Sequence, residues 1–124
     1  MDFKMHSLRD AFVEIQRYCA SYSLPKEACY NINLVCEELI VNLLKYTRTS
    51  GYNLVLSPDK EMTMINLYYQ ADRFDPTVVP KQEKKSVEKM HYGGLGLMLV
   101  NSLALKIEYQ YNEKQSLNVV KVIL

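Results

Sequence analysis

The sequence has no excess of charge of either sign. Its 124 residues include 15 basic and 14 acidic side chains, which leave a net charge of +1. Nucleic-acid-binding proteins usually present a basic patch or stripe to the phosphates. The densest basic run here, residues 81–85, also contains Glu83, and we interpret it as a solvated loop. We therefore expect no direct contact with nucleic acid.

Long apolar runs and paired cysteine motifs are also missing. No stretch approaches the roughly 18 apolar residues that a membrane-spanning helix needs, and the N-terminus has no signal-type pattern. The three cysteines, Cys19, Cys29 and Cys36, form no CxxC pair, and their odd number favours reduced thiols packed in a core. These absences predict a soluble, cytoplasmic protein without membrane contact.

What is present is the composition of an ordinary globular domain, with 48% hydrophobic and 23% charged residues. A chain of this length buries a core without needing metals or disulfides. It shows no internal repeat and no sign of a second domain. Residues 1–124 are therefore predicted to form a single domain.

The spacing of apolar residues predicts two helices, two strands, a loop, a helix and two strands. The first helix, over 7–22, should bury one face formed by Leu8, Phe12, Ile15, Cys19 and Tyr22. The other helices are expected over 26–46 and 95–105, and the strands over 52–56, 62–70, 106–111 and 117–124. Residues 57–60 read as a hairpin turn between the first two strands.

Residues 75–92 show no period, carry many charges and contain two prolines. A stretch of this kind inside a compact domain is usually functional, and we interpret it as a mobile lid. Helices followed by strands favour an α+β fold, a two-layer sandwich. We expect a mixed, mostly antiparallel sheet with helices on one face.

A polar stripe runs along the second predicted helix, where Glu38, Asn42 and Tyr46 are four residues apart. An asparagine amide oxygen can ligate Mg²⁺, and a carboxylate one turn away can orient or deprotonate a hydroxyl or a water. A solvent-facing helix edge would give the same spacing, so the stripe alone leaves both interpretations open.

Two further segments are candidates for a functional site. Gly93, Gly94, Leu95 and Gly96 open the third helix, where glycine lets the backbone approach a phosphate. A plain turn before a helix is the alternative, and no Walker A motif is present because no Gly-Lys-Ser/Thr follows. Residues 74–77, which read Phe-Asp-Pro-Thr, are by themselves only a turn signal.

In this order, the segments resemble the histidine kinase-like ATPase superfamily, also called the GHKL or Bergerat fold, and within it the anti-sigma-factor serine kinases. Residues 37–47 resemble the N box, residues 74–77 the end of the first glycine box, and residues 93–100 the second glycine box. Residues 118–120 resemble part of the last strand of these kinases. The resemblance covers nearly the whole chain from Leu8.

The resemblance implies a site for ATP and Mg²⁺, in which Asn42 ligates the metal and Glu38 is the catalytic base. Lys45 and Tyr46 would lie near the phosphates or the ribose. The backbone of residues 93–96 would hold the polyphosphate, and Asp75 would belong to the nucleotide site.

The chain departs from the family at the end of the site that reads the base. The first glycine box begins with an aspartate that accepts the adenine amino proton, and two residues later has a glycine. Without a gap, these positions are Tyr69 and Ala71 here. Asp72 could supply the carboxylate only with a two-residue deletion, so we favour the ungapped register.

Two functions follow from the resemblance. The first is an ATP-binding regulator of transcription, a serine/threonine kinase that phosphorylates an anti-anti-sigma (STAS) partner and sequesters a sigma factor, as a possible homodimer. The alternative is a degenerate, non-catalytic protein-binding module with weak or no nucleotide binding. A sensor histidine kinase does not fit, because we expect no phospho-acceptor helix and neither His6 nor His91 is a credible acceptor.

Overall fold

The computed structural model describes residues 2–78 and 95–124. The elements in chain order are α1 (Leu8–Ser21), α2 (Lys26–Tyr46), β1 (Tyr52–Asp59), β2 (Met62–Gln70), α4 (Leu95–Leu103), β3 (Lys106–Asn112) and β4 (Leu117–Ile123). Gly93, Gly94, His91, the basic run 81–85 and most of the predicted lid lie outside the described residues. No described helix has the length and apolar character needed to cross a membrane.

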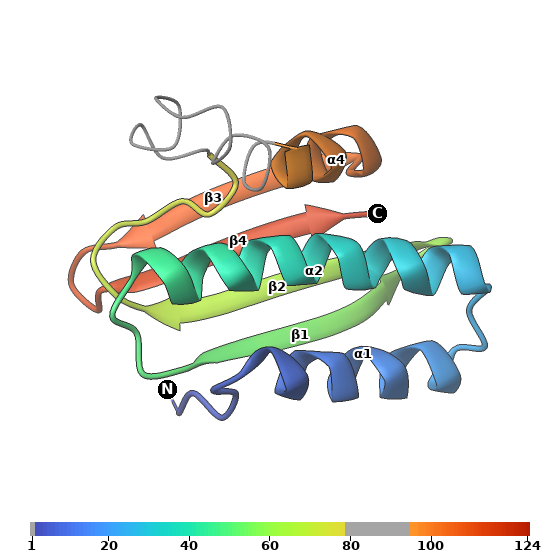
Figure 1. The fold of residues 1–124 in the computed structure, drawn as a ribbon, viewed down its shortest axis with the longest axis horizontal. Coiled ribbons are helices and arrows are strands. Elements are labelled where there is room, and N and C mark those ends of the chain that lie inside the picture. The colour runs from blue at the N-terminus through green and yellow to red at the C-terminus, as the bar shows by residue number, and fades with distance from the viewer. Residues whose placement is uncertain (1, 79–94) are drawn as a thin grey trace.

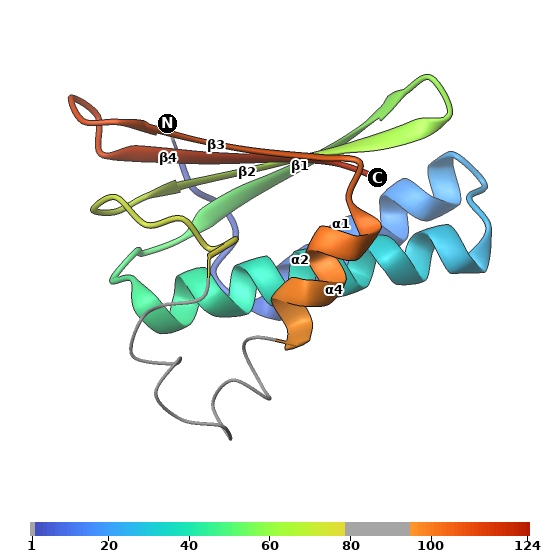
Figure 2. The same ribbon diagram turned by 90° about the horizontal axis from the view of Figure 1, so that it is seen from above.

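The strands form one sheet in the order β1-β2-β4-β3, and each neighbouring pair is antiparallel. The helices lie on one face of this sheet, as the two perpendicular views show (Figures 1 and 2). This arrangement confirms the predicted α+β sandwich.

Alternation along the strands decides which side chains face the helices. In β2 every second residue is buried, and β4 follows the same period. The turn between β1 and β2 differs from the prediction, because the strand runs on to Asp59 and the turn is formed by Lys60 and Glu61. Pro58 is tolerated in β1 because this strand lies at the edge of the sheet.

Helix α2 carries the centre of the core, and Val35, Leu39 and Leu43 on it are fully buried. The prediction for α1 was wrong in part, since Phe12 and Tyr22 are each 52% exposed. The helix packs against α2 and the edge strand β1, so it buries a stripe rotated away from Phe12. That stripe consists of Ala11, Ile15, Tyr18 and Cys19.

The expectation of three reduced thiols was also wrong. Cys19 near the end of α1 and Cys29 near the start of α2 form a disulfide, with Cα atoms 6.1 Å apart. The hairpin of two antiparallel helices brings these positions side by side, which their sequence spacing did not show. Cys36 is free and buried, and burial raises the pKa of its thiol to about 12.

Candidate functional site

The predicted magnesium ligand lies on the inner side of α2, beside the turn formed by residues 74–77. Asn42 is only 6% exposed, and its Nδ2 donates a hydrogen bond to the Pro76 carbonyl at 3.0 Å. The Asn42 carbonyl oxygen has no hydrogen-bond partner within the part of the chain that is described. Within the described residues, the amide is therefore held through Nδ2 alone.

Glu38 lies one turn earlier on α2 and packs directly against α4. A Cβ atom added at Gly96 would overlap the carboxyl group of Glu38, so any other residue at this position would require the Glu38 side chain to move. Burial and, secondly, the neighbouring charge of Glu37 raise the pKa of the Glu38 carboxyl. A carboxylate with a raised pKa is a stronger base, as proton abstraction near neutral pH requires.

These groups fit a magnesium ion that is shared with phosphates. An amide oxygen and a carboxylate are hard oxygen donors, and Mg²⁺ is usually bound by one or two protein groups together with substrate phosphates. Among residues 2–78 and 95–124, no group of three or more His, Cys, Asp and Glu side chains could hold a metal. If Mg²⁺ bound here, waters and substrate phosphates would supply its other ligands.

The rest of the α2 stripe contacts the same turn. The ring of Tyr46 lies 5.8 Å from the ring of Phe74, centroid to centroid. Lys45 is exposed, and its Nζ lies 5.0 Å from the centre of the Tyr46 ring. Tyr46 thus joins α2 to the start of the turn, while the charge of Lys45 lies at the surface beside it.

The first residues of the predicted lid, 75–77, form a hydrogen-bonded turn. Asp75 Oδ1 accepts hydrogen bonds from the backbone N–H of Thr77 at 2.9 Å and from its hydroxyl at 2.6 Å. Pro76 is buried. Residues 75–77 therefore belong to the packed domain, and Asp75 uses one carboxylate oxygen to hold the turn.

The predicted base-reading position is a closed part of the core. Tyr69 is 0% exposed, and its hydroxyl donates a hydrogen bond to the Phe74 carbonyl. Burial is the main cause that raises the pKa of Tyr69, so the phenol stays protonated and remains a donor. Asp72, the alternative base reader, lies in an exposed bend after β2. Ala71 is bonded through its N–H to the Ser116 carbonyl at 2.9 Å.

Two residues that were not predicted as site residues, Asn118 and Tyr109, bond to the turn at this end. Asn118 on β4 is fully buried, and its Oδ1 accepts from the Phe74 N–H at 3.0 Å and from the Tyr109 hydroxyl at 2.5 Å. The Tyr109 oxygen also accepts from the Phe74 N–H, at 3.0 Å. The sequence did contain one sign of this role for Asn118: it is the only asparagine among the inward-facing positions of β4, and the other two are valines.

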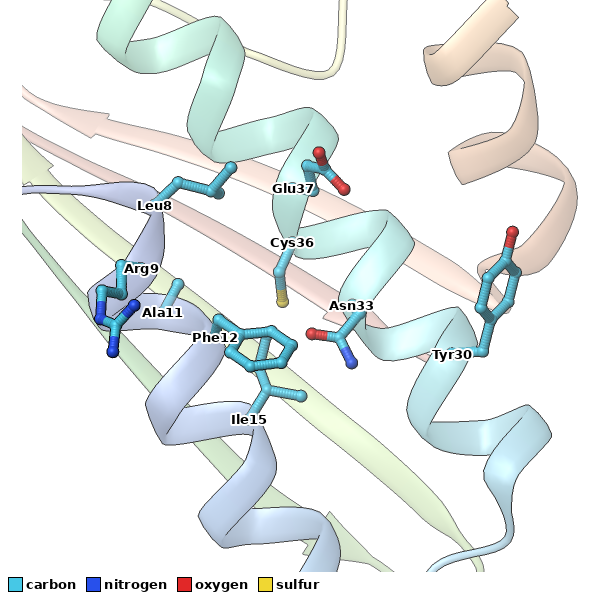
Figure 3. A pocket seen from close by; sticks show the side chains of 9 residues that line it. All are labelled: Leu8, Arg9, Ala11, Phe12, Ile15, Tyr30, Asn33, Cys36 and Glu37. Carbon is cyan, nitrogen blue, oxygen red and sulfur yellow. The ribbon is translucent and has the colours of Figure 1, made fainter.

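A hollow of about 550 Å³ lies between α1 and α2 and is shown in Figure 3. Buried Ala11, Ile15 and Cys36 contribute to its lining, together with the exposed rings of Phe12 and Tyr30. None of the predicted site residues lines it. The hollow is therefore a separate feature of the helix layer.

Comparison with known proteins supports the assignment that the geometry suggests. A family model described as the histidine kinase-like ATPase domain matches residues 2–124. No curated protein matches the chain. Domains of this family typically bind ATP together with Mg²⁺. Since the match runs over nearly the whole sequence and the sandwich has the expected layers, the chain belongs to the histidine kinase-like ATPase family.

Proposed function

We propose that this chain is a regulator of the anti-sigma-factor type that acts by binding a protein partner and holds magnesium nucleotide weakly, mainly through the phosphates. The partner that we propose is an anti-anti-sigma (STAS) protein, a sigma factor, or both in turn, in the cytoplasm. The resemblance of residues 74–77 and 93–100 to the glycine boxes of the anti-sigma-factor kinases supports this subtype. A homodimer fits the same subtype.

The observation that carries the proposal is the burial of Tyr69. The resemblance assigns this position to a carboxylate that accepts a proton from adenine, whereas here a phenol ring fills buried space and bonds to Phe74. Loss of a hydrogen bond to a charged group weakens binding by roughly 1.5–3 kcal/mol. This corresponds to about a 10- to 150-fold higher dissociation constant.

The other end of the site supports retained binding of phosphates. Asn42 keeps a carbonyl oxygen for Mg²⁺, and Glu38 lies against the first turn of α4 at Gly96. When bound, the metal would neutralise phosphate charge, and the protein would supply position rather than covalent chemistry. Affinity would then depend on the polyphosphate and little on the base.

A titration with three ligands tests this proposal. The purified protein is titrated by calorimetry with the magnesium complexes of ATP, GTP and inorganic tripolyphosphate. We expect dissociation constants within about threefold of one another, because each ligand offers the same phosphates. Asn42→Ala serves as the control and should weaken all three ligands alike. Binding of ATP more than tenfold tighter than GTP and tripolyphosphate would overturn the proposal.

Serine kinase activity is a second candidate, and the environment of Glu38 favours it. Burial raises the pKa of this carboxyl, and the side chain lies beside both Asn42 and α4, as a general base for a substrate hydroxyl should. Transfer of label from γ-labelled ATP to a STAS protein tests this activity. Transfer that Glu38→Gln abolishes would establish the kinase. No transfer at saturating nucleotide would exclude it for that partner.

A further inference from the structure

We infer that Asn118, together with Tyr109, is a positioning residue for Asn42, because it holds the turn whose carbonyl orients the Asn42 amide. The inference rests on the proposed function, in which Asn42 offers its carbonyl oxygen to magnesium. Asn118 lies on β4 and reaches Asn42 only through residues 74–76, so its action is indirect.

The first step concerns the hydrogen bonds of Asn118, which are saturated. A side-chain amide has two N–H donors and two acceptor lone pairs. The oxygen accepts from Phe74 and Tyr109, as described above, and Nδ2 donates to the Ala71 carbonyl at 3.1 Å and to the Tyr69 carbonyl at 3.5 Å. One fully buried side chain therefore ties the end of β2 to the turn that follows it.

The second step leads along the turn. The Phe74 N–H is held by Asn118 and Tyr109, and the Phe74 carbonyl is held by the Tyr69 hydroxyl. Only Asp75 separates Phe74 from Pro76, whose ring restricts the backbone torsion φ. The two hydrogen bonds from Thr77 to Asp75 stiffen the same short segment. The direction of the Pro76 carbonyl is thus set by the contacts at Phe74.

The third step concerns the Asn42 amide. A backbone carbonyl can only accept, so the Pro76 oxygen selects the Nδ2 side of the amide. The Asn42 oxygen then points the opposite way. If the Pro76 carbonyl moved, either orientation of the amide would be allowed, and the hard oxygen ligand would be presented only part of the time.

The test follows the Asn42 side-chain amide directly by ¹⁵N NMR, with its signals assigned by their loss in Asn42→Asp. We expect hydrogen exchange of this NH₂ group to be at least tenfold faster in Asn118→Ala than in the unchanged protein. Tyr109→Phe should give a smaller acceleration. Tyr111→Phe is the matched control on the strand that carries Tyr109, because the Tyr111 ring lies against the Arg73 guanidinium and its hydroxyl makes no hydrogen bond to residues 74–77. In Tyr111→Phe, the exchange rate of the Asn42 amide should stay within twofold of its rate in the unchanged protein.

A ligand readout separates this inference from the proposed function. Magnesium should strengthen the binding of tripolyphosphate in the unchanged protein. In Asn118→Ala, the factor by which magnesium lowers the dissociation constant should be at least tenfold smaller. An unchanged Asn42 amide in Asn118→Ala, with only a lower melting temperature, would overturn the inference. If Asn118→Ala does not fold, an unchanged amide in Tyr109→Phe overturns it. Loosening of the amide in a protein that binds no tripolyphosphate would support the positioning and refute the proposed function.

Discussion

The two ends of the candidate site use their polar groups differently. At the phosphate end, Glu38 and the carbonyl oxygen of Asn42 make no hydrogen bonds within the described parts of the chain. At the base end, Tyr69, Tyr109 and Asn118 bond to one another and to the turn at Phe74. Within the described residues, the first end therefore keeps polar groups that a ligand can use, whereas the second uses its polar groups to hold the protein together.

Closure of the base end has an energetic consequence. Buried polar groups that lose their partners destabilise a protein by about 1–3 kcal/mol each. A base entering beside Tyr69 would have to replace several of these bonds at once. The contrast between the ends therefore predicts which substitutions affect stability and which affect ligand binding.

The largest expected effect is on the closed end. Asn118→Ala leaves the Phe74 N–H and the Ala71 carbonyl without this partner, and we expect a loss of about 3 kcal/mol or more in the free energy of unfolding. Urea unfolding measures it. Asn66→Ala on the neighbouring strand β2 is the control, because its half-buried side chain takes no part in the network, and should change stability by about 0.5 kcal/mol or less. Equal losses in the free energy of unfolding would contradict the special role of the hydrogen bonds at the closed end.

Opening the closed end should restore recognition of the base. In Tyr69→Asp combined with Ala71→Gly, a carboxylate replaces the buried ring, and ATP affinity should rise about 10- to 150-fold while GTP affinity stays the same. The control, Tyr69→Ala with Ala71→Gly, opens the same space without the carboxylate and should not separate ATP from GTP. Calorimetry on folded variants measures both. Equal gains for both nucleotides would show that the register is wrong.

A steric change tests the phosphate end. Gly96→Ala places a methyl group on the Glu38 carboxyl, so either α4 or the side chain must move. Because the carboxyl is the far end of a flexible side chain, its displacement should cost little stability. Magnesium-dependent binding of tripolyphosphate should fall, since the carboxyl would no longer lie against the first turn of α4. Ser102→Ala, at an exposed position of the same helix, should leave this binding unchanged. A Gly96→Ala variant with unchanged binding would show that the position of the Glu38 carboxyl does not matter for the ligand.

The smallest expected effect is a pH dependence. The folded state raises the pKa of Glu38, so its contribution to stability is fully present below the unfolded pKa and is lost as pH rises through the folded pKa. Glu38→Gln should therefore melt at a higher temperature than the unchanged protein at pH 7. The difference should vanish below about pH 4, where both states are protonated. A variant that melts lower at pH 7 would mean that the ionised carboxylate stabilises the fold.

The structure also changes what is expected of Asn42. A side chain that only ligates Mg²⁺ from a helix edge would add little to stability. The side chain is instead buried and bonded to the Pro76 carbonyl, so Asn42→Ala should lower the melting temperature as well as weaken binding. Thermal unfolding without ligand checks the first effect.

The sequence by itself determined the order of the elements and the family. Helical and strand spacing depends on neighbours within one or two turns, so the predicted ranges for α2 and β2 agree with the structure at both ends. The polar stripe on α2, and a tyrosine where the resemblance without a gap leads one to expect an aspartate, were likewise visible in the residue order alone.

Tertiary structure alone decided how these elements meet. The exposure of Phe12, the disulfide of Cys19 with Cys29, and the contact of Glu38 with Gly96 each depend on how two helices pack. The closed base end depends on β4 pairing with β2, which brings Asn118 to residues 44 to 49 positions earlier in the chain. Local periodicity carries no information about such distant partners, because each hydrogen bond is selected by the backbone geometry of the whole sheet.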